Sequence, residues 1–140
     1  MDTSLFSHIN WLAVLVGGAG YFALGGIWYS FLFKNAWIKA SGINPDAPGA
    51  KSGVGGIMFT SFLLMIVASA GLGLLITKIG TFGWMSGTKV GLIVGVCFSA
   101  TAISISYLYE KKPMALHMIN GLYNIFGCVV AGIIIGVWPK

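Results

Sequence analysis

Charged side chains are scarce in this chain. Only 8% of its 140 residues are Asp, Glu, Lys or Arg, whereas soluble domains carry about 25%. Arginine is absent, all eight basic residues are lysines, and only three residues are acidic. Hydrophobic residues make up 57% of the chain. This composition excludes a soluble globular domain, and lipid is the solvent that it fits.

Four stretches of the chain contain no charged residue at all. Each supplies the roughly 20 residues that cross a hydrocarbon core of about 30 Å. None shows the two-residue alternation of barrel strands, so each is predicted to be a helix that satisfies its own backbone groups. The predicted helices are 9–33, 57–77, 88–109 and 114–138. The fold class is therefore all-α, a polytopic membrane protein whose single domain, residues 1–140, is a four-transmembrane-helix bundle.

The longest connection between predicted spans is expected to be a mobile loop. It runs from Lys34 to Gly56, and residues 42–49 are mostly Gly, Pro, Asn and Asp. Residues of these types favour turns and interrupt helices. We therefore predict no helix between the first two spans.

Lysines are unevenly divided between the two ends of the predicted bundle. The first and third connections carry five of them, and the opposite end carries three. Because cytoplasmic loops carry the excess of lysine, this bias predicts those connections in the cytoplasm and both termini outside. The net charge of +5 is spread over helix ends, which favours anionic lipid headgroups as partners and argues against nucleic acid.

No Asp, Glu, Lys or Arg lies inside the core of a predicted span. A buried ion is the usual mark of a proton relay, so its absence argues against a small proton-coupled multidrug exporter. Acid–base and metal chemistry in the bilayer are disfavoured for the same reason, and we expect no metal, no cofactor and no enzyme. Cys97 and Cys128 lie mid-span without metal-ligand spacing and are predicted to be packed thiols.

A polar stripe marks the last predicted helix. His117, Asn120 and Asn124 follow helical spacings of three and four, and Cys128 lies one turn further along the same face. One interpretation is a polar seam that lines a cavity or ligand site, with His117 titrating near its cytoplasmic mouth. The alternative is that the asparagines hydrogen-bond Ser or Thr on other helices and that His117 faces headgroups.

Small residues recur every four positions on the third predicted helix, and a similar pair occurs on the fourth. These residues are Gly87, Gly91, Gly95 and Ser99, and Gly132 and Gly136. Such faces let helix backbones approach closely, so they are predicted packing surfaces. Contacts within one chain and a homo-oligomer seam both fit the pattern.

Aromatic residues and lysines alternate where the first predicted span ends. The residues concerned are Trp28, Tyr29, Lys34, Trp37 and Lys39. Trp and Tyr collect at the interface of membrane and water, and lysines extend their amines toward it. We predict an interfacial anchor here, with an aromatic and cationic headgroup site as the alternative.

Two segments near the start of the chain carry a family resemblance. Residues 9–14 read Ile-Asn-Trp-Leu-Ala-Val, and residues 24–30 read Leu-Gly-Gly-Ile-Trp-Tyr-Ser, with Ala-Trp at 36–37. They resemble the opening of the bacterial membrane family known as domain of unknown function 1761. The end of the chain, from Ile119 to Trp138, is similar too, so the resemblance covers essentially the whole sequence.

The most specific part of this resemblance is the Trp-Tyr-Ser triplet followed by Trp37. The sequence departs from the family pattern at Phe31 and Lys34, which stand where Pro and Gly are expected, so a helix break there is not implied. The resemblance implies a four-helix protein of the bacterial cytoplasmic membrane. It supplies no activity, substrate or site residue.

Two function classes fit these observations. The first is a non-enzymatic bundle that binds or passes a small neutral or lipophilic molecule, or a lipid, along the seam at Asn120 and Asn124. The second is a structural or accessory scaffold that assembles through its glycine-rich helix faces. Ligand binding should depend on the seam in the first class, whereas assembly should not depend on it in the second.

Overall fold

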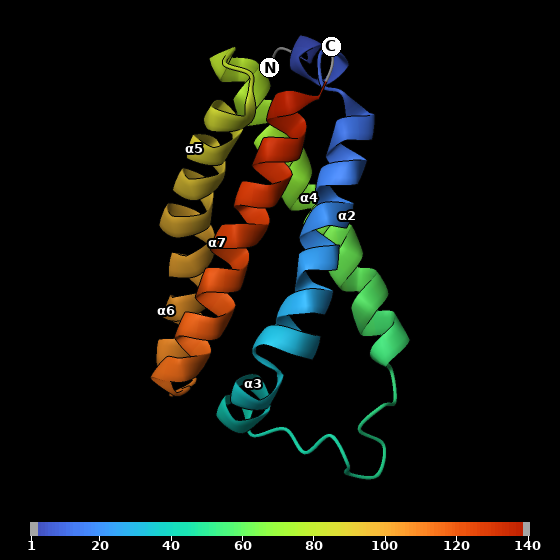
Figure 1. Cartoon of the computed structure of the whole chain (residues 1–140), viewed down its shortest axis with the longest axis vertical. Coiled ribbons are helices and arrows are strands. Elements are labelled where there is room, and N and C mark those ends of the chain that lie inside the picture. Colours follow the sequence, from blue (N-terminus) through green and yellow to red (C-terminus); the bar gives the residue numbers. More distant parts are fainter. Residues whose placement is uncertain (1–2, 139–140) are drawn as a thin grey trace.

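Four long apolar helices make up most of the structure. The computed structural model describes residues 3–138, which contain helices, turns and no strand. Its four candidate membrane spans are Trp11–Leu32, Val54–Ile79, Trp84–Tyr109 and Met114–Val137. Successive spans run in opposite directions, so the start of the first and the end of the fourth lie at the same end (Figure 1). The predicted all-α, four-helix membrane fold is confirmed.

Two of these spans contain a π-helical turn, and two short helices lie outside the spans. The first span consists of α2 and the π-helical turn η1, and the third consists of α5, the π-helical turn η2 and α6. The elements are α1 (Ser4–Ser7), α2 (Trp11–Ile27), η1 (Trp28–Leu32), α3 (Lys34–Ser41), α4 (Val54–Ile79), α5 (Trp84–Val94), η2 (Gly95–Ala100), α6 (Thr101–Tyr109) and α7 (Met114–Val137).

Local sequence explains where several helices begin and end. Asn10 caps α2 by accepting the backbone N–H of Ala13 at 3.1 Å. Gly42 and Gly80 end α3 and α4 with φ of 71° and 74°, a left-handed conformation that glycine adopts at little cost. Pro113 stands directly before α7, where its fixed φ does not interrupt a helix.

The prediction of an unstructured connection from 34 to 56 is wrong in its first part. Helix α3 occupies Lys34–Ser41, because glycine and proline begin only at Gly42. The first span is separated from α3 by a bend at Phe33, with φ of −123°. A helix break therefore follows the Trp-Tyr-Ser triplet although neither proline nor glycine stands there.

Helix α7 is the central element of the bundle. It packs against α5 on one side and against α2 on the other, and α4 crosses behind them (Figure 1). The largest side chains that are fully buried come from α2, α4 and α7. They are Val14, Ser69, Leu72, Ile76 and Cys128.

Helices α5 and α7 approach each other through glycine. A Cβ atom added at Gly91 would lie 2.5 Å from the carbonyl oxygen of Cys128, and one added at Gly95 would lie 2.7 Å from the Cα of Ile125. Gly87 and Gly132 face each other's backbone in the same interface. The Gly83 N–H donates to the carbonyl of Gly136 at 2.6 Å, which joins the α4–α5 turn to the end of α7.

Helix α4 is packed along only half of its length. Its second half contributes Ser69, Leu72, Gly73 and Ile76 to the core. Its first half diverges from α2, and residues 54–60 are all exposed (Figure 1). The end of the bundle that carries α3 is therefore more open than the end that carries the termini.

Candidate functional site

A network of tyrosines and asparagines joins three spans and extends from the middle of the bundle toward its open end. The Asn120 Oδ1 accepts a hydrogen bond from the Tyr29 hydroxyl at 2.6 Å, and its Nδ2 donates to the Tyr107 hydroxyl at 2.6 Å. Asn124 Oδ1 accepts from the Tyr21 hydroxyl at 2.5 Å. The two asparagines lie one turn apart on α7, and the Asn124 Nδ2 donates to the Asn120 carbonyl at 2.8 Å.

The π-helical turn η1 directs two neighbouring side chains toward α7. The Phe33 N–H donates to the carbonyl of Trp28, five residues back, at 2.8 Å. Trp28 Nε1 donates to the carbonyl of Ile119 at 3.1 Å, while Tyr29 reaches Asn120. Wide helical turns of this kind occur frequently at functional sites.

The hydrogen-bond partners of the asparagines are not the Ser and Thr side chains that the alternative to a ligand seam named. Asn120 and Asn124 bind tyrosine hydroxyls, whereas the alternative to a ligand seam paired them with Ser or Thr. Tyr21 and Tyr107 were missed as members of the site. Tyr21 carried a usable signal, because a phenol in the middle of a span needs a hydrogen-bond partner.

His117 and the two cysteines take different positions. His117 is 8% exposed, and its ring meets that of Tyr107 edge-on at 5.4 Å, so most of this side chain is covered by the bundle. Cys128 is buried, with its Sγ 3.7 Å from the Oγ of Ser99. Cys97 is exposed, so its prediction as a packed thiol is wrong.

The predicted interfacial anchor divides into two parts. Trp28 is only 6% exposed and lies in the core, so for this residue the prediction is wrong. The carbonyl of Ile119 offers its indole N–H a partner inside the bundle, and no contact with water is needed. Trp37 packs edge-on against Tyr29 at 5.5 Å. Lys34 and Lys39 are exposed on α3.

A pocket of about 470 Å³ lies beside the network, between the end of α2 and the first half of α4. Tyr29 and Tyr123 form its inner wall, and Met58 and Met65 form the α4 side. A Cβ atom at Gly25 would lie 2.7 Å from the Tyr123 hydroxyl, so glycine is required for that tyrosine to approach α2. Asn120 and Asn124 are behind this wall and do not line the pocket.

The pocket has apolar walls with a few hydroxyl groups. Methionine supplies flexible, polarisable surface. Ser30 and Ser61 also line the pocket, and among the described residues neither hydroxyl has a hydrogen-bond partner. No charged residue is part of the lining. This environment suits a small uncharged molecule with one or two polar groups.

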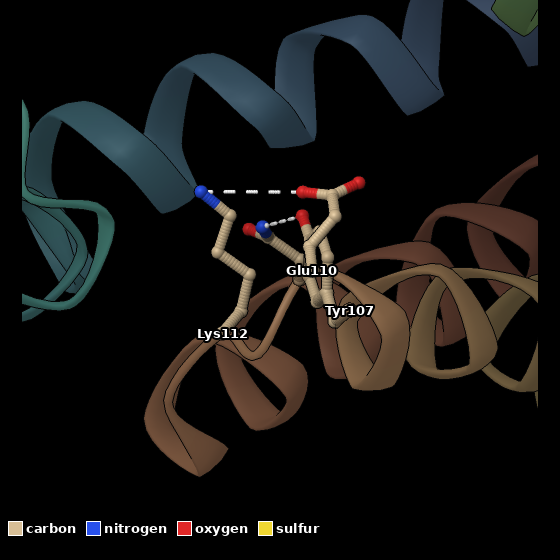
Figure 2. Close-up of polar contacts among 4 residues, drawn as sticks. Tyr107, Glu110 and Lys112 are labelled. Carbon is tan, nitrogen blue, oxygen red and sulfur yellow. Dashed lines mark hydrogen bonds and ion pairs between the residues drawn. The ribbon is translucent and has the colours of Figure 1, made fainter.

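Charged residues lie nearby on the α6–α7 turn. Lys112 Nζ is 4.0 Å from Glu110 Oε2, and this ion pair lies beside the hydroxyl end of Tyr107 (Figure 2). Both side chains are substantially exposed, with 39% and 55% of their surfaces accessible, so the pair contributes little to stability.

Four helices that are long and apolar enough to cross a membrane define a multi-pass membrane protein with four spans. The chain belongs to the family described as "Protein of unknown function (DUF1761)", which matches residues 12–136. The resemblance found in the sequence is thereby confirmed. Neither curated proteins nor solved structures gave a match.

Proposed function

We propose that this protein is a non-enzymatic membrane protein that binds a small neutral, lipophilic molecule in the α2–α4 pocket. The observation that carries the proposal is the pocket of about 470 Å³ with Tyr29 and Tyr123 in its inner wall. Its volume lies within the range of about 300 to 1,000 Å³ typical of small-molecule sites.

The hydrogen-bond network prepares this wall for a ligand. The Tyr29 hydroxyl donates to Asn120, and the Tyr123 hydroxyl donates to the carbonyl of Tyr21 at 3.3 Å. Each phenol oxygen therefore keeps lone pairs that accept a hydrogen bond. Ser30 and Ser61 add hydroxyls that both donate and accept. A ligand that carries a hydroxyl or amide group fits this set.

A binding role is favoured over a catalytic one by the chemistry of the polar groups. The network consists of tyrosine and asparagine side chains that already hydrogen-bond one another. Enzymes that use a nucleophile instead pair it with a positioned base. We infer that the network holds the pocket wall in place.

A scaffold role through the glycine faces has less support. Gly87, Gly91 and Gly95 face α7 within the chain, and Gly132 and Gly136 face back toward α5 and the turn before it. These surfaces are therefore occupied. A homo-oligomer would have to use another face of the bundle.

The proposed cellular setting is supported by the family resemblance and the lysine bias. We infer a bacterial cytoplasmic membrane, with α3 and the α6–α7 turn in the cytoplasm and both termini outside. A membrane-impermeant thiol reagent tests this in intact cells that lack the native cysteines. It should label Ser86→Cys and spare Ser52→Cys, and the reverse pattern would contradict the orientation.

Native mass spectrometry tests the binding role. The protein is released from lipid particles cut from its host membrane, and retained small molecules are weighed. Gly26 lines the pocket and has no atom within 4 Å of an added Cβ, so Gly26→Leu fills the pocket without a clash at the backbone. Gly71, on α4 outside the pocket, is equally open, and Gly71→Leu is the matched control.

The proposal predicts one defined adduct in the wild type and in Gly71→Leu that is lost in Gly26→Leu. Persistence of that same small-molecule adduct in Gly26→Leu contradicts it, whereas a phospholipid bound outside the α2–α4 pocket does not bear on it. A wild type that retains only bulk phospholipid contradicts it as well.

A further inference from the structure

We propose that the groove between α6 and α7 binds an anionic phospholipid, with one acyl chain in the groove and the phosphate at the α6–α7 turn. This site is independent of the proposed function. It shares no lining residue with the α2–α4 pocket.

The groove matches one leaflet of a bilayer in length. It has a volume of about 460 Å³ and follows α7 from Met114 to Ile125. At 1.5 Å per residue, that distance is about 16 Å. Half of a hydrocarbon core of about 30 Å is nearly the same. The side chains of Leu108, Met118 and Leu122 give the groove an apolar lining suited to an acyl chain.

His117 lies in the groove near its polar end. The residue is 92% buried, since 8% of its surface is accessible, and it lines the groove one turn from Met114. Among the described residues its ring nitrogens have no hydrogen-bond partner. Every fully buried side-chain nitrogen in the described chain has a hydrogen-bond partner. The unpaired ring nitrogens of His117 are therefore still partly accessible from the surface. A phosphate or ester oxygen at this end of the groove gives His117 the partner that it lacks.

The charges at the turn select an anion. Lys112 is paired with Glu110, whereas Lys111 has no ion pair with any described residue. Helix α7 begins at Met114, directly after the turn, and its N-terminal N–H groups favour negative charge. The turn that carries the unpaired Lys111, the start of a long helix and the unpartnered His117 are therefore at the same end of the apolar groove.

Lipid competition measured by native mass spectrometry tests this site. Delipidated protein in mild detergent is mixed with equal amounts of dioleoyl phosphatidylglycerol, which is anionic, and dioleoyl phosphatidylcholine, which is not. A lysine beside an anionic lipid contributes about five-fold in affinity. We expect the wild type to retain the anionic lipid preferentially and Lys111→Gln to lose about five-fold of that retention.

Three further variants separate this site from general surface charge. Lys51→Gln removes the same charge from the loop at the same end and should change nothing. His117→Phe keeps a ring against Tyr107 while it removes the hydrogen bond, and should reduce retention about tenfold. Ser104→Leu blocks the groove and should reduce retention of both lipids, whereas Ser104→Ala, which removes only the hydroxyl, should not.

Equal retention of the two lipids by the wild type would overturn the proposal. Equal effects of Lys111→Gln and Lys51→Gln would overturn it too, because the preference would then come from net charge. Circular dichroism confirms that each variant is folded before its lipids are counted. If Ser104→Leu does not fold, Met118→Trp at the exposed rim of the groove replaces it, with the same expected loss.

Discussion

Two of the helices around α7, α5 and α4, differ in how closely they pack. Helix α5 meets α7 backbone to backbone, and an added Cβ at Gly91 or Gly95 would lie within 2.7 Å of α7 atoms. At the other side, the first half of α4 leaves α2 and α7, and a pocket of about 470 Å³ remains between them. Glycine gives close contact on one side, and methionine and tyrosine line open space on the other.

In the proposed function, this difference separates the tightly packed part of the bundle from the part that binds a ligand. Within lipid, helices associate through close packing and hydrogen bonds, because lipid tails are as apolar as the side chains. The α5–α7 contact supplies the close packing. The Tyr–Asn network supplies hydrogen bonds where packing is loose, so the open end keeps a defined shape and still has room for a ligand.

The largest expected effect is at the glycine interface. Gly91→Leu places a side chain against the Cys128 carbonyl and should separate the two helices, at a cost of about 3 kcal/mol or more in unfolding free energy. Gly71→Leu, at an open helical position, should change stability by less than about 0.5 kcal/mol. Unfolding in mixed detergent and dodecyl sulfate micelles measures both. Equal stabilities would remove the distinction between tight and open packing.

Two leucines compare the halves of α4 directly. Leu72 is 1% exposed in the second half, and Leu64 is 63% exposed in the first. Leu72→Ala should cost about 2 kcal/mol or more, because it leaves a cavity in the core. Leu64 faces lipid, so Leu64→Ala should lower the free energy of unfolding by less than about 0.5 kcal/mol. A comparable loss in both variants would show that the first half of α4 is packed as well.

The hydrogen-bond network should contribute an intermediate amount. Asn120→Leu removes the partners of the Tyr29 and Tyr107 hydroxyls and should cost about 1 to 2 kcal/mol. Adding Tyr29→Phe and Tyr107→Phe removes the unpaired hydroxyls and should recover part of that loss. A double-mutant cycle pairs Asn120→Leu with each tyrosine variant in turn. If the losses in unfolding free energy simply add in both cycles, these side chains do not interact.

The smallest expected effect separates two serines of α4. Ser69 Oγ donates to the carbonyl of Val14 at 2.9 Å, whereas Ser61 has no such bond to a described residue. Ser69→Ala should cost about 0.6 kcal/mol, the average value of one interhelical hydrogen bond in a membrane. Ser61→Ala should leave stability unchanged. A loss in Ser61→Ala would place that serine in a contact of the folded protein.

Features imposed by the bilayer were predictable from sequence. The positions of the four spans follow from the placement of lysines and acidic residues, because hydrocarbon excludes charge and requires helices. The glycine repeats on the third span likewise identify a face on which a backbone can approach. These constraints are local to one helix, and a single sequence displays them.

Features that depend on two helices were not predictable in the same way. Helical spacing placed Asn120 and Asn124 on one face, but it did not reveal Tyr21, Tyr29 and Tyr107 as their partners. The turn η1 directs Trp28 inward, and no residue in it predicts a π-helical turn. The pocket depends on where α4 diverges from α2. The sequence of either helix taken alone does not predict that point.

Photo-crosslinking through methionine tests the central claim most directly. Photo-methionine, incorporated throughout the chain, places reactive groups at Met58 and Met65 in the pocket and at Met85, which is 53% exposed on α5, as a control. Irradiation in host membranes followed by peptide mass spectrometry identifies what each residue contacts. The account predicts one defined lipophilic adduct at Met65 that is absent from Met85 and is lost in Gly26→Leu. The same mixture of bulk lipids at Met65 and Met85 would contradict it.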